Sequence, residues 1–478
     1  MSTSVSQFSE SGKLAALTLI IEKSSELLAS VGVEIADDFM QEQLKEKGFE
    51  VDTTTDMVRI PVPLQKKLLS KVPKTVKLYY RNSEKYVEIG GGKTHFTTSG
   101  YGSSVLDLNT EERRASVSED IETFVTAQNY LDNVDIAGPL VTATELSESK
   151  ADLTGFYKLL TCTDKPFMYK TVDEKNISSI VDMASVVADG IENLRAKPNF
   201  CMIFTPTSPL MYTPKTVNSM LKLASYGIPV VPLTMTMGGA TAPVTILGQI
   251  MQTNAEIIAG IMIVQAFYPG HPTLYGNASS VMDMKTSVLA LGVPERPLVN
   301  EVCSLAAKHY GIPNITSGLS TDSKSFDIQC GVEKVLTLMP LMGNVGMVFG
   351  MGAMDSANTY SLTQLIIDNE IAGAVRHYYE FCYGDNLDEE MGILQRYGTK
   401  AEFLKEKHTF KRARNYWRTE LFTRDSFSKW KNKEGSQENP ASSKAKELAT
   451  KHAPDICPDT AALLKEMYEK FMESSIDN

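Results

Sequence analysis

Apolar and polar positions follow one order repeatedly along this chain. A short apolar stretch leads into a polar segment of small residues, and then into a segment with apolar residues at helical spacing. This order occurs eight times, with apolar stretches at 94–99, 134–138, 166–170, 199–205, 229–234, 273–277, 314–318 and 345–349. Eight strand–helix units are the number that closes a barrel, so we expect an α/β fold of the (β/α)₈ TIM-barrel type.

The segments on either side of these units differ from them. We place the barrel at residues 94–383. Residues 1–93 predict a long helix, short strands and a hairpin, and we expect them to cap the bottom or side of the barrel. Residues 384–478 are charged and rich in helix formers, so they predict a C-terminal helical extension.

Composition excludes several classes of protein. The formal net charge of −11 argues against nucleic-acid binding, which needs clustered Lys and Arg. The longest apolar stretch, 257–267, is too short to span a bilayer and predicts a buried helix. The N-terminus has no signal-peptide pattern, and the six cysteines include no Cys-x-x-Cys pair. We therefore expect a cytoplasmic protein with no membrane or nucleic-acid partner.

The histidines lie away from the predicted reactive end of the barrel, which is the end where the strands finish. His95 and His271 begin strands, and His309 and His377 fall on helices. Metal sites and serine or cysteine triads therefore lack their usual histidine, and we expect no metal site. This pattern indicates a reaction that needs little acid–base chemistry from the protein.

The strand ends carry aromatic residues instead. Tyr101, Tyr275 and Phe349 are candidate walls of a binding site, with Met351 beside them, although methionine at such positions is more often part of a core. Aromatic faces attract quaternary ammonium groups by up to about 2 kcal/mol for each desolvated contact. The strand ends therefore predict a site for a cationic ligand that forms few hydrogen bonds.

Charged and glycine residues at the same ends are further candidates. Asp322, Asp355 and Glu145 could stabilise a bound cation as catalytic groups, or could cap helices. An anionic end of the ligand could be bound by charged or backbone donors. Lys324 or Lys170 could bind this end, although such lysines are more often solvated. The backbone N–H groups of Gly238 and Gly239 could also bind it, and the alternative is that the two glycines only form a tight turn.

Three motifs resemble a known family. They are Gly238-Gly-Ala-Thr-Ala-Pro-Val244, then Ser317-Gly-Leu-Ser-Thr-Asp-Ser-Lys324 with Asp327 and Gln329, and a tail with His408-Thr-Phe-Lys-Arg, Trp417 and Trp430. On these motifs the chain resembles the trimethylamine methyltransferase family over nearly its whole length. The resemblance implies a barrel fold and a corrinoid (cobalamin) cofactor. No corrinoid-binding Asp-x-His-x-x-Gly pattern occurs here, so the corrinoid is expected on a partner protein that docks over the barrel mouth.

The resemblance also implies a substrate class. Archaeal trimethylamine enzymes of the family carry pyrrolysine, whereas this chain has standard residues only. It is thus similar to the members that demethylate quaternary amines, with glycine betaine as the first candidate and proline betaine, carnitine or γ-butyrobetaine as others. A quaternary ammonium cannot be protonated, so the enzyme has mainly to orient the methyl group and exclude water. Methyl transfer to Co(I), in a homo-oligomer, is what the resemblance implies.

Two other functions fit the pattern of strand-end residues. A non-catalytic quaternary-amine binding protein would use the same aromatic walls without transferring a methyl group. A barrel lyase or aldolase would need an activated lysine, for which Lys170 is the plausible candidate at a strand end.

Overall fold

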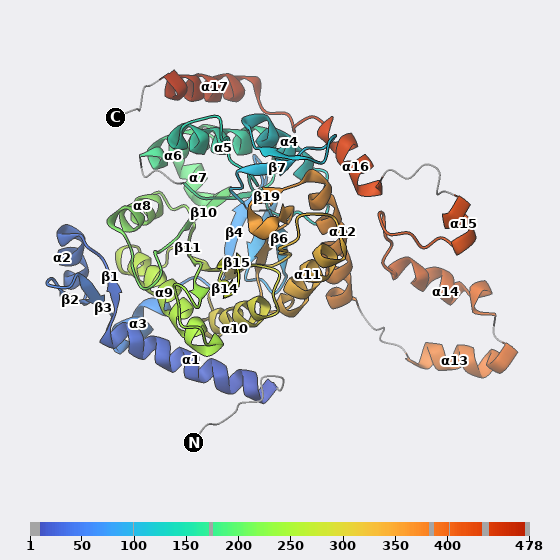
Figure 1. Ribbon diagram of the computed structural model, residues 1–478, viewed down its shortest axis with the longest axis horizontal. Coiled ribbons are helices and arrows are strands. Elements are labelled where there is room, and N and C mark those ends of the chain that lie inside the picture. Colours follow the sequence, from blue (N-terminus) through green and yellow to red (C-terminus); the bar gives the residue numbers. More distant parts are fainter. Residues whose placement is uncertain are drawn as a thin grey trace.

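A computed structural model of the chain describes residues 10–98, 100–171, 175–381, 387–400, 402–432 and 439–473. Ser99, at the end of the first predicted strand, and the predicted barrel boundary at 383 lie outside the described residues. Figure 1 shows a central ring of strands, viewed roughly along the axis of the ring and surrounded by helices.

Seven parallel strands form a nearly closed barrel, in the order β6-β17-β16-β13-β11-β10-β9. Their bounds in that order are His95–Thr97, Met347–Phe349, Asn314–Ser317, Tyr275–Asn277, Val230–Thr234, Phe200–Phe204 and Phe167–Tyr169. Residues 136 and 137, in the second predicted strand, lie between the two edges. Ile136 forms a parallel bridge to Thr97, and Ala137 forms one to Phe167. The predicted α/β fold with a parallel barrel is therefore confirmed, and seven of the eight predicted apolar stretches contain a strand.

A helix follows each barrel strand and also the bridging segment. In chain order these helices are α4 (Ser118–Gln128), α5 (Glu148–Cys162), α6 (Asn176–Val187) with α7 (Ile191–Ala196), α8 (Pro214–Ser225), α9 (Ile246–Phe267), α10 (Glu295–Tyr310), α11 (Ile328–Leu338) and α12 (Leu362–Glu380). Side chains alternate along the strands between these helices and the barrel interior. In β17, for example, Val348 belongs to the core under the helices, whereas Met347 belongs to the core inside the barrel.

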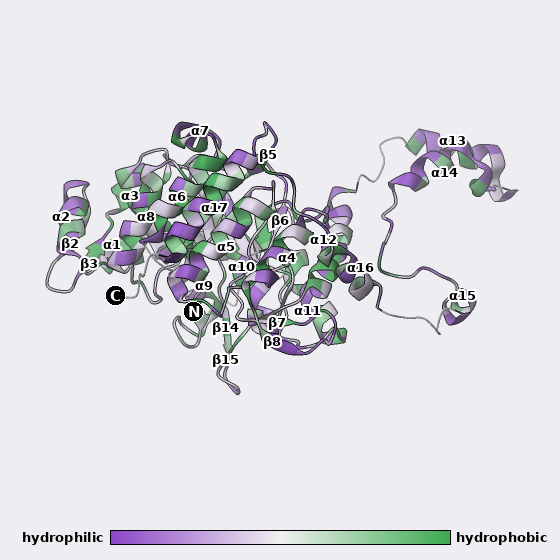
Figure 2. Ribbon diagram, turned by 90° about the horizontal axis from the view of Figure 1, so that it is seen from above, coloured by the Kyte–Doolittle hydropathy of each residue, from purple (hydrophilic) through white to green (hydrophobic). Residues whose placement is uncertain are grey.

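A hairpin closes the end of the barrel at which the strands begin. Its strands are β4 (Val76–Tyr79) and β5 (Tyr86–Ile89). Val76, Leu78 and Ile89 pack into the same core cluster as the inward side chains of the barrel. Figure 2 shows β5 on one side of the molecule, opposite the β14–β15 and β7–β8 hairpins. The interior of the barrel is thus filled and closed at this floor, so a cavity that opens from the barrel interior to solvent has to lie at the other end.

The remaining N-terminal elements lie beside the barrel (Figure 1). They are α1 (Glu10–Ser30), β1 (Val33–Glu34), α2 (Asp38–Glu46), β2 (Glu50–Asp52), β3 (Met57–Arg59) and α3 (Val62–Leu69). Helices α1 and α3 pack on α9, and the three strands form a small antiparallel sheet.

Two small sheets extend the barrel at the mouth, the end where the strands finish. One contains β12 (Met237–Gly238), β14 (Ser280–Asp283) and β15 (Val288–Ala290), and it follows β11 and β13. The other contains β18 (Ala353–Met354), β19 (Thr359–Tyr360), β7 (Ser104–Leu106) and β8 (Arg113–Ala115), and it follows β17 and β6. We call them the two rim sheets. Sequence reasoning did not predict them, because strands of two to four residues are too short for a periodic pattern.

The C-terminal part first leaves the barrel and then returns to it. Helices α13 (Leu387–Tyr397), α14 (Lys407–Arg412) and α15 (Phe427–Asn432) form an arm that projects from the body in both views (Figures 1 and 2). Helices α16 (Pro440–Ala449) and α17 (Pro458–Glu473) pack back on the barrel helices, α16 on α12 and α17 on α5 and α6.

Helix α9 is the one helix of the described chain that is long and apolar enough to cross a membrane, by length and composition alone. Its most apolar window is 83% buried inside the protein, and it packs against α1, α10 and β11. The apolar stretch 257–267 lies within it, so the prediction of a buried helix there is confirmed.

We expect one buried histidine to make the stability of the fold depend on pH. His271 lies just before β13, and its Nε2 donates to the Ile228 carbonyl at 3.0 Å. Burial lowers the pKa of His271 from 6.5 to about 4, so the folded protein keeps this ring neutral. The unfolded chain takes up the proton near pH 6.5. The stability due to the neutral ring is therefore complete above that pH and falls, by about 3 kcal/mol in all, as the pH drops towards 4.

Urea unfolding between pH 7 and 4 measures this dependence. We expect the slope of unfolding free energy against pH to be shallower in His271→Gln than in the parent protein. Equal slopes for the two proteins would contradict the assignment.

Candidate functional site

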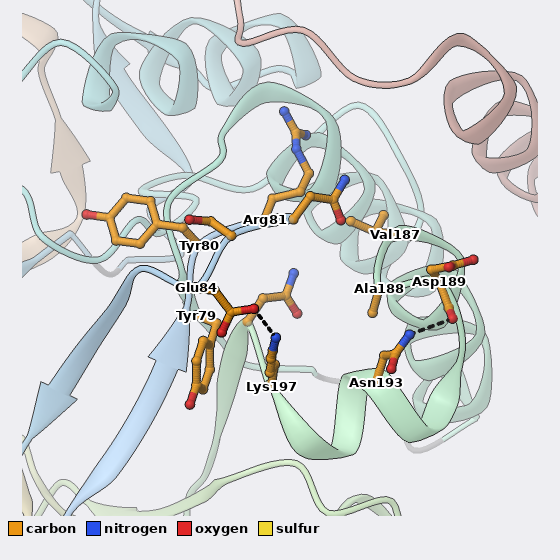
Figure 3. Close-up of a pocket in the computed structure, with 12 residues that line it drawn as sticks. Tyr79, Tyr80, Arg81, Glu84, Val187, Ala188, Asp189, Asn193 and Lys197 are labelled. Atoms are coloured by element: carbon orange, nitrogen blue, oxygen red, sulfur yellow. Dashed lines mark hydrogen bonds and ion pairs between the residues drawn. The ribbon is translucent and has the colours of Figure 1, made fainter.

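A hollow at the floor of the barrel lies between the β4–β5 turn and α6–α7 (Figure 3). Three of its charged side chains already have partners. Lys197 pairs with Glu84, and Arg81 donates to the carbonyls of Leu160, Pro454 and Asp455. These contacts fix the hairpin tip to the helices and to the C-terminal segment. They are typical of a structural joint, and the floor of such a barrel is not where its chemistry occurs.

A second cavity, of about 270 Å³, lies at the mouth, where the second rim sheet contributes Ala353 and Tyr360 to its lining and residues flanking the strands of the first contribute Met235, Ala278 and Leu291. We call it the mouth cavity. Its lining residues are Gly100, Tyr101, Lys170, Ile203, Thr205, Leu233, Met235, Ala278, Leu291, Arg296, Ser317, Ser320, Thr321, Phe349, Gly350, Ala353, Ala357 and Tyr360. Met235 is 51% exposed, so the cavity reaches the surface. Its position at the ends of the strands makes it the candidate active site.

Three aromatic rings stand in this lining: Tyr101, Phe349 and Tyr360. Tyr360 is buried and lies against the backbone of the predicted glycine-rich strand end. A Cβ on Gly100 would lie 2.1 Å from the Tyr360 hydroxyl oxygen, and a Cβ on Gly102 would lie 2.4 Å from its ring. Both positions therefore need glycine because the Tyr360 ring occupies the space beside them.

Arg296 is the most deeply buried charge in the lining, with 3% of its surface exposed. It lies in the first turn of α10, and its Nη2 donates to Ser317 Oγ. Its Nε and Nη1 have no hydrogen-bond partner among the described residues. Burial lowers the pKa of Arg296 to about 10, which Asp322 opposes, so the group stays cationic at neutral pH.

Lys170 is the second cation in the lining, at the end of β9. Burial lowers the pKa of Lys170, and the nearby Asp152 carboxylate opposes that shift. Tyr101 lies close by, with its ring edge-on to Tyr169 at 5.9 Å between centroids. Burial raises the pKa of the Tyr101 hydroxyl well above 10, and a hydrogen bond from the Lys170 backbone opposes that shift.

Asp322, a predicted catalytic residue, is not in the cavity lining. Its carboxylate accepts hydrogen bonds from the backbone N–H groups of Leu291 and Gly292, at 2.7 and 2.9 Å, and from Ser356 Oγ at 2.7 Å. Leu291 follows the β14–β15 hairpin, and Ser356 lies between β18 and β19. Asp322 therefore joins the two rim sheets and fixes the start of α10, which makes it a positioning residue.

Of the other predicted charged residues, Lys170 lines the cavity, whereas Asp355, Lys324 and Glu145 lie outside the lining. Asp355 Oδ1 pairs with Lys324 Nζ at 3.3 Å, and Lys324 also donates to the Asp322 carbonyl. Lys324 is 69% exposed. Glu145 is exposed and accepts from the Ser118 N–H at the start of α4, at 2.8 Å. The structure thus differs from the expected carboxylate wall, because each of these carboxylates already accepts a hydrogen bond or pairs with a surface cation.

Some of the predicted aromatic, methionine and glycine candidates line the cavity, and the others lie in the core or in a turn. Tyr101 and Phe349 line the cavity, as described above. Tyr275 faces the helix layer, where its hydroxyl lies 3.1 Å from Asn254 Oδ1, and Met351 is fully buried in the same core. Gly238 and Gly239 form a tight turn in which the Gly239 N–H already donates to the Ala242 carbonyl. Neither glycine lines the cavity.

Sequence reasoning missed Arg296 and Tyr360. Arg296 sits on a helix rather than at a strand end, but an arginine in the first turn of a helix opposes the helix dipole and is therefore a usable signal. Tyr360 lies well beyond the eighth predicted strand. The paired glycines at 100 and 102 were a signal that a bulky group packs there, although they do not say which one. In the described ranges no three His, Cys, Asp or Glu side chains are grouped as a metal site would require.

Solved structures with a similar fold belong to methylamine methyltransferases. A hydroxylamine complex of MtmB aligns with a TM-score of 0.51 and 12% identity, covering 95% of this chain and 92% of that one. The monomethylamine methyltransferase of Methanosarcina barkeri aligns with a TM-score of 0.50, also at 12% identity, with the same coverage. At this identity the likeness concerns the fold alone.

Sequence comparison is more specific. A family model described as trimethylamine methyltransferase (MTTB) matches residues 9–474. The trimethylamine methyltransferase MttB of Methanosarcina barkeri is 30% identical over 453 residues, 92% of this chain and 90% of that protein. A glycine betaine methyltransferase of Desulfitobacterium hafniense is 27% identical over 423 residues, 86% of each chain. This chain therefore belongs to the trimethylamine methyltransferase family, as its motifs indicated.

Proposed function

We propose that the protein transfers a methyl group from a quaternary amine, first of all glycine betaine, to Co(I) of a corrinoid carried by a separate protein. The same reaction on proline betaine, carnitine or γ-butyrobetaine is the alternative within this class. The observation that carries the proposal is an aromatic-lined cavity at the open end of the barrel in a chain of this family. The proposal takes the barrel as an eight-stranded (β/α)₈ barrel that residues 134–138 complete.

The lining fits the needs of such a substrate. Tyr101, Phe349 and Tyr360 line the cavity, and an aromatic face in contact with a desolvated quaternary ammonium contributes up to about 2 kcal/mol. Apolar side chains such as Ile203 and Leu233 keep water away from the methyl group. The protein's main task is then to hold one methyl group in line with its acceptor.

The corrinoid supplies a reduced cobalt whose electron pair forms the new bond to the methyl carbon. The carbon–nitrogen bond breaks with its electron pair on nitrogen, and a tertiary amine leaves. No proton has to move in this step. A reaction without proton transfer agrees with the cavity lining, which in the described part of the chain contains no histidine and no carboxylate.

The surface around the mouth fits a protein partner that brings the corrinoid. Four apolar side chains are exposed there: Met235 by 51%, Val244 by 65%, Met284 by 67% and Val288 by 50%. Val244 and Met284 meet over the turn at Gly239, where a Cβ would lie within 4 Å of both. We call these four residues the rim patch. Exposed apolar groups gathered at one site are typical of an interaction surface.

Charge added to the rim patch should weaken partner docking and leave the substrate site intact. We expect Met284→Glu and Val244→Glu each to lower kcat/KM for the corrinoid protein by about 10-fold or more, as for truncation of an interface hot spot. Glycine betaine binding and the rate with free cob(I)alamin should stay unchanged. Leu14→Glu, an equally exposed position on α1, is the control. Unchanged kinetics in both rim variants would rule out this docking surface.

The homo-oligomer implied by the resemblance is proposed to form through the arm. Leu387, Leu404, Phe410 and Phe427 there are between 67 and 94% exposed. The segment 405–431 carries nine basic and three acidic residues, in a chain with a net charge of −11. We propose that this basic arm docks on the acidic body of a second copy. Light scattering of the purified chain at low and high salt tests this.

The proposed activity is tested with the purified chain, reduced corrinoid protein or cob(I)alamin, and a panel of quaternary amines. Methylation of the corrinoid, followed by its absorbance, supports the proposal. Binding of glycine betaine without any methyl transfer would instead support a non-catalytic binding protein. A cytoplasmic location remains part of the proposal.

A further inference from the structure

The mouth cavity contains a buried cation whose hydrogen-bonding capacity is only partly used. Arg296 is 3% exposed and lines the cavity, and only its Nη2 has an acceptor, Ser317 Oγ. Its Nε and Nη1 have none in the described chain. Buried polar groups in folded proteins almost always have hydrogen-bond partners, and a buried charge without one is especially unfavourable. Both nitrogens have almost no accessible surface, so a ligand reaches them only once the guanidinium turns towards the cavity, and their unused donors then favour a ligand that supplies acceptor atoms.

The position of Arg296 in the fold points to an anionic acceptor. It lies in the first turn of α10, a helix of 16 residues. The helix N-terminus is the positive end of the dipole, so a cation there is placed against the field. That placement does not stabilise the helix. The helix N-terminus and the guanidinium together make a local positive potential that favours a negative group.

The surrounding charges lead to the same conclusion. Lys170 lines the cavity as well, and among the described lining residues there is no Asp or Glu. Asp322 lies near enough to affect Arg296, but its carboxylate is bonded to the Leu291 and Gly292 N–H groups and to Ser356, and no ion pair joins it to Arg296 in the described chain. Among the described lining residues a simple cation would meet two positive charges and no carboxylate, because Asp152 and Asp322 lie behind the lining, near Lys170 and Arg296 respectively.

We propose that Arg296 binds a carboxylate of the substrate, so that the substrates are zwitterionic amines in which a carboxylate accompanies the quaternary ammonium. This inference rests on the proposed function, because the aromatic walls are needed to hold the ammonium end. It excludes cations without an anionic group, such as choline and tetramethylammonium, as good substrates. The sequence analysis gave this role to Lys324 or Lys170 and to the Gly238–Gly239 turn, and the proposal gives it to Arg296 on α10, with Lys170 in the same lining.

Calorimetry on the full chain with three probes tests this. Glycine betaine carries both charges, 3,3-dimethylbutanoate has the same shape and only the carboxylate, and choline has only the cation. We expect wild-type protein to bind glycine betaine and 3,3-dimethylbutanoate competitively, and choline at least about 30-fold more weakly than glycine betaine. Arg296→Met should weaken both carboxylate ligands by a similar factor, and Arg296→Lys by less. Arg195→Met, at an exposed position on α7, should change nothing.

Thermal melting shows first that each variant folds, and Arg296→Lys serves if Arg296→Met does not. Choline binding as tight as that of glycine betaine, with no loss in the folded Arg296 variant, would overturn the inference. The two proposals fail separately. Arg296-dependent carboxylate binding without methyl transfer supports the anion site and contradicts the proposed activity. Methyl transfer from choline that does not depend on Arg296 supports the activity and contradicts the anion site.

Discussion

Asp368→Ala is expected to lower the free energy of unfolding by about 3–5 kcal/mol, the usual effect of removing one partner from a buried ion pair. Asp368 on α12 pairs with Lys334 on α11 at 2.7 Å, and neither side chain has any exposed surface. The same carboxylate accepts from the Gly352 N–H and from Gln364 Nε2, both at 2.7 Å. The variant would leave an ammonium group without its partner in a dry interior.

The double variant Lys334→Met with Asp368→Leu separates charge from packing. Replacing a whole buried pair with apolar groups is often neutral, so this variant should recover most of the lost stability, apart from the Gly352 N–H and the Gln364 Nε2 group that lose their acceptor. Lys465→Met, which removes an exposed ion pair with Glu469 on α17, should hardly change the unfolding curve. Urea denaturation measures all three. A small effect of Asp368→Ala would mean that water reaches the pair.

Gly100→Ala is expected to lower kcat/KM for methyl transfer by about 100-fold, the effect of a misplacement of about 1 Å in an active site. Its Cβ would lie 2.1 Å from the Tyr360 hydroxyl oxygen and 2.7 Å from the Leu140 carbonyl. Tyr360 is buried and cannot turn away into solvent, so its ring has to move within the cavity lining. Binding of glycine betaine should weaken together with the rate.

Two further variants make this result specific. Gly102→Ala would bring a Cβ to 2.4 Å from the same ring and should act in the same direction. Gly331→Ala on α11 has no atom within 4 Å of the added carbon and should leave the activity unchanged. Full activity in Gly100→Ala, after melting curves show that it is folded, would mean that Tyr360 does not form a wall of the substrate site.

The barrel could be predicted from the sequence because each of its strands is a buried apolar run followed by small polar residues. Stretches such as 199–205 and 314–318 contain β10 and β16 in the structure. The rim sheets could not be predicted, since β12 and β18 have two residues each and gain their partners only through tertiary contacts. Both faces of these strands are buried, so the sequence does not show whether a side chain points to the helices or to the barrel interior. Tyr275, for example, faces the helices rather than the cavity.

The sequence predicted only those residues of the candidate site that lie at the ends of barrel strands. Phe349 is the last residue of β17 and Tyr101 comes shortly after β6, and both line the cavity. Arg296 lies on a helix and Tyr360 on a strand of the second rim sheet. Only the tertiary fold brings these two residues to the cavity, so a search limited to the ends of the barrel strands does not find them. Asp322 was singled out for its charge, but charge alone does not distinguish a reacting group from one that holds two loops together.

The β4–β5 hairpin has a kinetic consequence. The hairpin seals the barrel floor, so the amine cannot enter from that end. The amine must therefore use the same opening at the mouth that the methyl acceptor would cover. Binding should then be ordered. If the proposed corrinoid carrier docks over that opening, the amine has to enter first, and the demethylated product can leave only after the carrier has left. Steady-state kinetics would show this as inhibition by excess carrier at low amine concentration.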